Sequence, residues 1–320
     1  MLKKARSLSR RDLIAGSAWA AAAGAARAQS DAGGRYTICA FSKHYQWTGV
    51  GEAAAICARL GFEGMDLTVR AGGHVLPERV QDDLPKAVEI TRRAGLKFSM
   101  ITSDIVDVNT RHAEAVVKTM AALGVHWYRW GGMRYDLKRS IPDQLAECKV
   151  RVKDLAAMNK QYGVCAMYHT HSGVGQVGAS LWDLYILLKD FDPQAVAVNY
   201  DVGHATVEGG LGGWIHSAGL LMPYMQGVAV KDFKWMQGAR GAWEPGWCAL
   251  GQGMVDFKRF LPMLKAARFS GPLQLHMEYP ELGGADTGKT AFSIPREQLL
   301  AIMQRDLDVL KRLLREAGMA

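Results

Sequence analysis

The chain has 320 residues, 49% of them hydrophobic, and its 39 Lys and Arg against 31 Asp and Glu give a formal net charge of +8. Six of the basic residues and one acidic residue fall within residues 1–28, which leaves 33 basic and 30 acidic residues in the rest of the chain. This near-neutral remainder has no basic stripe interleaved with aromatic residues, so the composition argues against nucleic-acid binding.

The first 28 residues are predicted to be an export signal. The adjacent Arg10 and Arg11 precede an apolar run, and Ala26 and Ala28 provide a small-residue cleavage site before Gln29. The apolar run of about 14 residues is shorter than the roughly 20 that a membrane-spanning helix needs. We therefore expect twin-arginine export to the periplasm or the exterior, with a mature domain over 29–320 that has no membrane span.

Short β-type runs alternate with helical patterns along the rest of the chain. Strands are predicted at 36–41, 64–67, 97–101, 127–130, 164–168, 197–200, 227–230 and 273–277. Helices are predicted at 51–60, 83–94, 110–123, 142–162, 181–190, 213–225, 255–267 and 295–316. Eight such units without a glycine-rich phosphate turn after the first strand favour the α/β class, with a single (β/α)₈ TIM barrel rather than an open doubly wound sheet.

Ionisable side chains gather at the predicted strand ends, where TIM barrels carry their catalytic groups. The candidates are Arg129, His169, His171, Asp201, His204, Lys231, His276 and Glu278. Residues two apart on a strand share a face, so His169 should lie beside His171, and His276 one layer below Glu278. Imidazole and carboxylate groups suit a divalent metal and equally suit acid–base work without one, and spacing alone does not separate these roles.

Six stretches resemble the sugar phosphate isomerase/epimerase group, whose fold is the xylose-isomerase-like barrel. They are GFEGMDLTVR (61–70), AMYHTHSG (166–173), VNYDVGHATVEGG (198–210), VAVKDFKW (228–235), LGQGMVDF (250–257) and GPLQLHMEYP (271–280). Their order and spacing cover nearly the whole mature chain. The resemblance implies an enzyme that isomerises or epimerises a carbohydrate by removing a proton next to a carbonyl group.

The resemblance also implies a metal site, from which this chain departs at two positions. In the metal-dependent epimerases of the group, Glu, Asp, His and Glu from strands five to eight hold the metal. Asp201 and Glu278 match two of these ligands, whereas His169 replaces the first glutamate and the histidine position falls at Ala229. Of the two glutamates that move the proton in ketose 3-epimerases, only Glu278 is retained.

Three accounts of the site follow from this departure. In the first, His169, Asp201 and Glu278 hold Mn²⁺, Co²⁺, Zn²⁺ or Mg²⁺, His204 completes the ligand set, with His171 or His276 as alternatives, and Glu278 or His169 moves the proton. In the second, Lys231 replaces the metal as the cation that stabilises an enolate. In the third, catalysis is lost and the barrel only binds carbohydrate.

A lyase or hydratase acting on 3-oxo-glycosides is the alternative enzymatic reading. The expected export and the missing second glutamate both favour it, because removal of a leaving group needs no second base.

Candidate substrate-binding residues complete the site. They are His171, His204, Arg129 and Trp243. Trp243 belongs to a glycine-rich segment between the seventh and eighth strands that also holds Trp235 and Trp247. This segment is predicted to be a mobile loop whose aromatic rings stack on a sugar, with ordinary loop packing as the alternative. A carbohydrate is the expected partner, and a homo-oligomer is compatible with the sequence.

Overall fold

The computed structural model describes residues 36–319 of the chain. The export signal predicted over residues 1–28 lies outside this range. Among the described helices, none is both long enough and apolar enough to cross a membrane.

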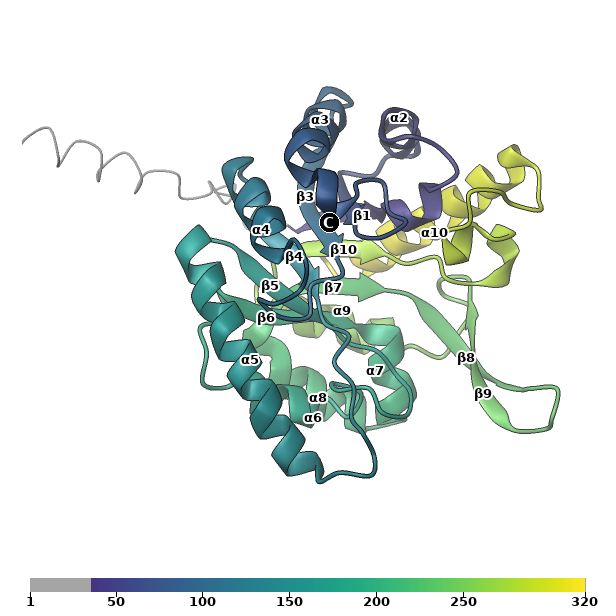
Figure 1. The fold of residues 1–320 in the computed structure, drawn as a ribbon. Coiled ribbons are helices and arrows are strands. Elements are labelled where there is room, and N and C mark those ends of the chain that lie inside the picture. Colours follow the sequence, from purple (N-terminus) through teal and green to yellow (C-terminus); the bar gives the residue numbers. More distant parts are fainter. Residues whose placement is uncertain (1–35, 320) are drawn as a thin grey trace, which may run out of the picture. The chain divides into compact units, whose positions relative to one another are not determined.

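Eight parallel strands close into a barrel, which confirms the predicted fold class (Figure 1). The strands are β1 (Thr37–Phe41), β2 (Gly64–Val69), β3 (Lys97–Ser103), β4 (Trp127–Trp130), β5 (Cys165–His169), β6 (Val196–Asp201), β7 (Met225–Val230) and β10 (Pro272–Leu275). They follow one another around the barrel in chain order, and β1 pairs with β10 to close it. The carboxyl ends of all eight strands therefore meet at one rim.

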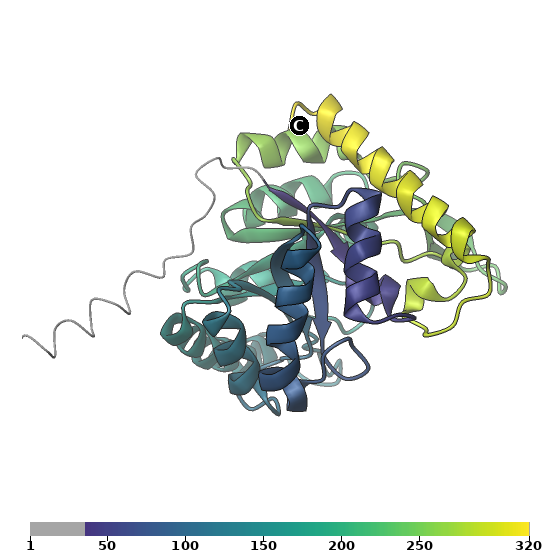
Figure 2. The ribbon, with the colours of Figure 1, turned by 90° about the horizontal axis from the view of Figure 1, so that it is seen from above.

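Helices surround this barrel. They are α2 (Val50–Leu60), α3 (Val80–Arg93), α4 (Ala113–Ala122), α5 (Ile141–Tyr162), α6 (Trp182–Leu188), α7 (Val202–Gly209), α8 (Gly213–Leu221), α9 (Phe257–Ala266) and α10 (Arg296–Glu316). Gly61 ends α2 and Gly163 ends α5 in the left-handed conformation, with φ of 90° and 68°. Figure 2 shows α10 on the outside of the barrel, where it packs against α2 and α9.

The sequence prediction missed α7, which begins directly at the end of β6. This helix has only eight residues and includes two glycines, so its hydrophobic periodicity is too short to recognise. The Asp201 side chain accepts a hydrogen bond from the backbone N–H of His204, at 3.0 Å, and so caps the helix. One residue thus ends a strand, starts a helix and faces the barrel rim.

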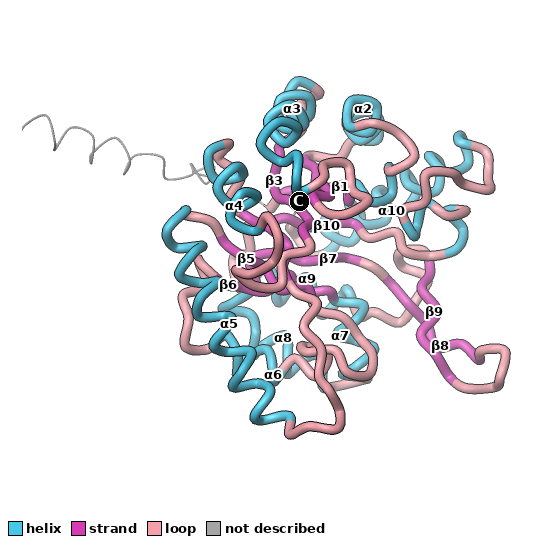
Figure 3. The backbone as a smooth tube through the Cα atoms, viewed as in Figure 1, coloured by secondary structure: helices cyan, strands magenta, loops and turns pink. Residues whose placement is uncertain are grey.

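The prediction of a loop between the seventh and eighth barrel strands is wrong. The segment forms an antiparallel ribbon of β8 (Asp232–Gln237) and β9 (Trp243–Cys248), which projects beyond the barrel (Figures 1 and 3). Asp232 fixes its base, because the buried carboxylate accepts backbone hydrogen bonds from Gly251, Gly253 and Val255 at 2.9–3.1 Å. Regular cross-strand pairing explains why the glycines of this segment do not produce a free loop.

The barrel interior changes from apolar to polar along its axis. Met100, Cys165, Met167 and Ala197 form a small apolar cluster that is separate from the main core outside the sheet. Since side chains alternate along a strand, His169 follows Met167 on the inner face of β5, and Asp201 lies on the inner face of β6 with Ala197. The apolar cluster therefore lies inside the barrel, one layer below the ionisable groups of the rim.

Candidate active site

Lys231 is the centre of the ionisable cluster at the rim. It follows β7 and is only 4% exposed. Its Nζ lies 2.7 Å from Glu278 Oε2, 2.8 Å from His204 Nε2 and 3.3 Å from Asp201 Oδ2. The contacts with Glu278 and His204 are hydrogen bonds, whereas the contact with Asp201 is an ion pair without a hydrogen bond. A single lysine thus links side chains that follow β6, β7 and β10.

Charge pairing fixes the ionisation of this cluster. Burial by itself lowers the pKa of Lys231, but the charges of Asp201 and Glu278 outweigh it and raise the pKa. Burial acts in the opposite sense on Glu278, where Lys231 and Lys43 lower the pKa well below its ordinary value. The pKa of Asp201 is raised to about 6 because burial outweighs the attraction of Lys231. At neutral pH the site therefore holds a charged lysine and an ionised glutamate.

A second ammonium reaches Glu278 from the short helix η1 (Ser42–Tyr45). Lys43 Nζ lies 2.5 Å from Glu278 Oε1. His44 fixes this turn, since its Nδ1–H donates to the Ala285 carbonyl at 3.2 Å and its Nε2 accepts from the Met277 N–H at 3.1 Å. Burial lowers the pKa of His44 to about 4, which keeps the ring in the neutral form that both bonds require. His44 therefore positions Lys43, a role that the sequence pattern did not reveal.

His169, Asp201 and His276 offer the atoms of a candidate metal site. One ligand atom from each lies within 4.8 Å of the others, and His169 Nε2 is 3.6 Å from Asp201 Oδ2. Within the described chain, His169 Nδ1, Asp201 Oδ2 and both ring nitrogens of His276 are buried without a hydrogen-bond partner. Burial lowers the pKa of both histidines well below the ordinary value, so they are neutral and able to bind a metal. Two imidazoles and a carboxylate suit a divalent cation with open positions.

This set differs from the predicted ligand set in two members. Glu278 and His204 were predicted to join His169 and Asp201, but both are bound to Lys231 in the structure. His276, the alternative ligand, lies with the other two instead, and its ring stacks on Phe41 at 4.4 Å. The chain thus departs from the metal ligands of the family, and Lys231 forms hydrogen bonds with two of the residues that were predicted to be ligands, Glu278 and His204.

The predicted substrate-binding residues lie in different places. The ring of His171 is 4.6 Å from His169 and 5.1 Å from His204, at the mouth. His204 Nδ1 bonds to Ser172 Oγ at 2.7 Å, which leaves Nε2 to accept from Lys231.

Trp243, by contrast, is 67% exposed, at the turn end of the ribbon. Trp247, four residues later on the same face of β9, is the tryptophan that covers Lys231, at 4.2 Å from Nζ to the ring centre. The prediction named Trp235, Trp243 and Trp247 as the aromatic residues of this segment and chose Trp243 as the substrate-binding one, whereas Trp247 is the one that lies against Lys231. An even spacing along the strand places Trp243 and Trp247 on the same face of β9. Only the register of pairing between β8 and β9 shows which of the two lies over the mouth.

Strands β2 to β4 supply the other side of the mouth. Asp66 is fully buried, and the hydroxyl of Thr102 lies 2.9 Å from both of its carboxylate oxygens. Arg129 Nη2 lies 3.4 Å from His171 Nε2. Burial raises the pKa of Asp66 to about 7 although Arg129 and Arg70 both act to lower it. The sequence places Asp66 and Arg70 at the end of the second strand, but the prediction gave neither a catalytic, binding or metal-ligating role.

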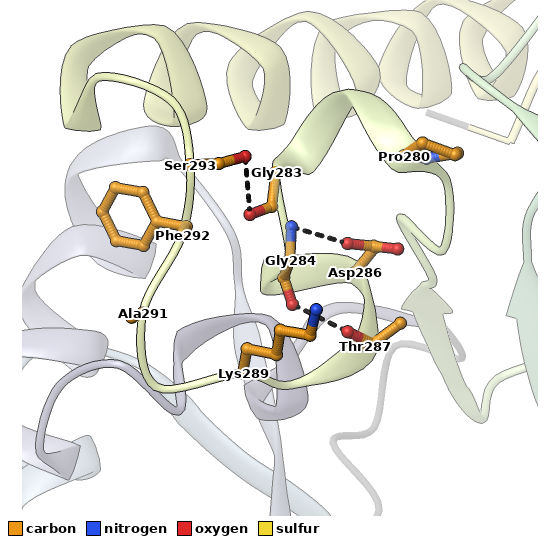
Figure 4. A pocket seen from close by; sticks show the side chains of 9 residues that line it. All are labelled: Pro280, Gly283, Gly284, Asp286, Thr287, Lys289, Ala291, Phe292 and Ser293. Carbon is orange, nitrogen blue, oxygen red and sulfur yellow. Dashed lines mark hydrogen bonds between the residues drawn. The ribbon is translucent and has the colours of Figure 1, made fainter.

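Two cavities flank the mouth rather than contain the cluster. The larger measures about 530 Å³ and is lined by residues that follow β10, from Pro280 to Ser293 (Figure 4). The other measures about 440 Å³ and is lined by the segment after β5 together with α7, including Gly173 and Glu208. None of the residues that pair with Lys231 lines either cavity.

A closed parallel barrel with ionisable groups at the carboxyl rim defines a TIM-barrel protein, and TIM-barrel enzymes carry their active sites at that rim. The chain belongs to the xylose isomerase-like TIM barrel family, whose sequence model matches residues 54–319. Among proteins with curated descriptions, none matches the chain in sequence.

Solved structures share this fold at low sequence identity. A xylose isomerase domain protein from Planctomyces limnophilus is 16% identical with a TM-score of 0.64, over 89% of this chain and 99% of that one. A xylose isomerase-like TIM barrel protein from Mycobacterium smegmatis, in complex with magnesium, is 16% identical with a TM-score of 0.60, over 87% and 98%. D-allulose 3-epimerase from Methylomonas sp., in complex with D-allulose, is 15% identical with a TM-score of 0.63, over 87% and 97%.

Proposed function

We propose that this protein is an isomerase/epimerase-type enzyme that moves a proton next to a carbonyl group of a carbohydrate. The observation that carries this proposal is the Glu278 carboxylate, held between Lys43 and Lys231 at the carboxyl rim of the barrel. A carboxylate in this setting is ionised and fixed in direction, and it would gain the basicity that a general base needs when a bound substrate loosens one of the two ion pairs. The family and the sugar bound to the Methylomonas epimerase support a carbohydrate substrate.

His169, Asp201 and His276 would hold a divalent metal, Mn²⁺, Co²⁺, Zn²⁺ or Mg²⁺. Such an ion, when bound, polarises the substrate carbonyl and so acidifies the neighbouring C–H group. Lys231 keeps Glu278 and His204 out of the ligand set and neutralises the charge of Glu278. Trp247 lies against Lys231 and shields the pair from water, which strengthens their attraction.

Proton exchange with solvent tests the chemistry directly. The mature protein is incubated in D₂O with a panel of ketoses and aldoses, and incorporated deuterium is measured by mass spectrometry. Glu278→Gln should lower the exchange rate by about 10²- to 10⁴-fold, the usual contribution of a positioned base. Glu281→Gln, three residues away, exposed and paired with Arg305, is the matched control and should keep the wild-type rate. Full exchange in Glu278→Gln would contradict the assignment.

Metal analysis tests the role of the histidines and Asp201. The purified mature protein should contain one divalent metal per chain, and His276→Ala should lose it, as measured by elemental analysis. Chelator should abolish deuterium exchange, and returning the metal should restore it. A protein that works without bound metal and is indifferent to chelator would contradict the metal-assisted mechanism and leave Lys231 as the cation of the site.

Elimination is a second candidate reaction, favoured by one observation. Among the mouth-facing residues at the strand ends of the described chain, Glu278 is the only glutamate, and His169 stands at the end of β5. Proton removal followed by loss of a leaving group needs one base, whereas epimerisation also needs a group that returns the proton. We propose 3-oxo-glycosides as lyase substrates, which an exported enzyme would meet. Release of the aglycone would support this reaction, and stereoisomers as the sole products would exclude it.

A further inference from the structure

Two guanidinium groups occupy the β2–β4 side of the mouth. Arg129 alternates with Trp127 on β4, and Trp127 packs against the apolar cluster inside the barrel, so Arg129 also lies on the inner face. Arg70 directly follows β2 and shares the face of Asp66 and Thr68. Both arginines are half-buried. They therefore reach the mouth from strands two and four of the barrel.

Neither guanidinium has an acidic partner in the described chain. No carboxylate oxygen lies within 4.0 Å of the side-chain nitrogens of Arg70 or Arg129, whereas Lys43 and Lys231 both touch Glu278. The Arg129 side chain contacts His171 instead, with Nη2 3.4 Å from His171 Nε2. The acidic groups of this side include Asp66, which lies beneath the rim with Thr102 on its oxygens, and the exposed Asp104, which accepts a hydrogen bond from the Ala71 N–H at 3.2 Å. Both guanidinium groups thus lie at the mouth without a carboxylate at ion-pair distance in the described chain.

Such an arrangement is costly unless something neutralises it. Burial and repulsion from Arg70 together lower the pKa of Arg129, and they outweigh the attraction of Glu278, Asp66 and Asp201, none of which lies within 4.0 Å of the guanidinium nitrogens. Guanidinium groups bind carboxylate and phosphate oxygens in a two-pronged geometry and lose less hydration than an ammonium does. A bound anion would supply the missing partner for both arginines.

We infer that Arg70 and Arg129 form a subsite for an anionic substituent of the substrate, a carboxylate or a phosphate group. The inference rests on the proposed function, because it names the class of carbohydrate that this mouth accepts. Contact through His171 connects the subsite with the centre, since the His171 ring lies 4.6 Å from His169. An acidic sugar held by the arginines would extend across the mouth towards Glu278.

Calorimetry with paired probes tests the subsite. The mature protein is titrated at low salt with D-glucose, D-glucuronate, D-glucose 6-phosphate and inorganic phosphate. At least one acidic sugar should bind tenfold or more tightly than D-glucose, and this preference should shrink as salt is added. Tighter binding of D-glucuronate alone identifies a carboxylate as the substituent. Tighter binding of the phosphorylated sugar, with competition by inorganic phosphate, identifies a phosphate.

Variants assign the preference to the two arginines. Arg129→Gln and Arg70→Gln should each reduce the affinity for the acidic sugar to within about threefold of that for D-glucose. Arg129→Lys, which keeps the charge but loses the fork, should be intermediate. Arg59→Gln, which removes an exposed arginine from the last turn of α2, is the matched control and should bind as the wild type does. Thermal unfolding of each variant verifies that it is folded.

Two results would overturn the inference. One is equal or absent binding of the acidic probes and D-glucose by the wild type, and the other is a preference that survives in both Arg70→Gln and Arg129→Gln. Neither depends on turnover, because binding is measured without reaction. Loss of deuterium exchange in Glu278→Gln tests the proposed function separately, so the failure of one idea is distinguishable from the failure of the other.

Discussion

The two sides of the barrel mouth hold similar side chains but differ in how their charges are paired. On the β6–β10 side, Lys231 and Lys43 contact Glu278 at 2.7 and 2.5 Å, and Lys231 also contacts Asp201. On the β2–β4 side, no carboxylate of the described chain lies within 4.0 Å of Arg70 or Arg129. On the first side each ammonium is paired with a carboxylate of the chain, which keeps Glu278 ionised. On the second side, the anionic group of a bound substrate would pair with Arg70 and Arg129.

The largest effect is expected when the central cation of the paired side is removed. Lys231→Met keeps most of the side-chain volume but leaves Asp201 and Glu278 without their shared ammonium. Breaking a buried ion pair in this way commonly costs about 3–5 kcal/mol. Urea unfolding in the presence of chelator should show a loss of this order at pH 7, with Lys234→Met, exposed on the ribbon, unchanged.

The same variant should also be sensitive to pH. Without Lys231 the pKa values of Asp201 and Glu278 rise in the folded state, so both groups favour protonation. A raised carboxyl pKa stabilises the folded state at low pH, and this stabilisation is lost as pH rises. The deficit of Lys231→Met should therefore be smaller at pH 5 than at pH 8. An equal deficit at both values would show that lost packing, not lost pairing, causes the effect.

The fold was within reach of the sequence because it depends on local patterns. Alternating β-type runs and helices, with Gly61 and Gly163 at helix ends, located all eight barrel strands. The ribbon was missed because glycines at 238, 241 and 246 resemble loop residues, whereas cross-strand pairing from Phe233 to Trp247 decides the structure. Such pairing is a contact between segments and leaves no local signature.

The sequence predicted which residues lie at the site, but not which of them contact one another. Parallel strands bring their carboxyl ends to one rim, so Asp201, Lys231 and Glu278 had to lie near one another. The choice of partners depends on distances across the barrel, which no spacing encodes. For this reason the grouping of His276 with His169 was not the leading prediction. Lys43 was missed as a partner of Glu278 because η1 places it there through contacts with residues more than 200 positions away.

A pH-dependent effect of similar size is expected from the buried carboxyl group of the unpaired side. The pKa of Asp66 is about 7 in the folded protein against an ordinary 3.8, so the folded state binds the proton more tightly than the unfolded state does. Asp66 then stabilises the fold below pH 4, and this contribution is lost as pH rises to about 7, at about 1.4 kcal/mol per pKa unit of the difference.

Replacing Asp66 should remove that pH dependence. Asp66→Asn should unfold in urea with a stability that changes less between pH 4 and pH 7 than the stability of the wild type. Asp308→Asn, at an exposed position of α10, is the control and should keep the wild-type slope. If both variants keep that slope, Arg70 and Arg129 neutralise Asp66 as Lys231 neutralises Glu278, and the contrast between the two sides disappears.

The smallest effect on stability is expected when a cation of the unpaired side is removed. Arg129→Gln loses one contact to His171, but it also relieves the repulsion from Arg70 and breaks no ion pair. Its free energy of unfolding without ligand should stay within about 1 kcal/mol of the wild type, as is usual when no buried pair is broken. Lys231→Met, measured in the same urea series, gives the reference. If Arg129→Gln lost as much free energy of unfolding as Lys231→Met does, an acidic group of the chain would already neutralise Arg129. Arg129 would then have no unpaired positive charge with which to bind an anion.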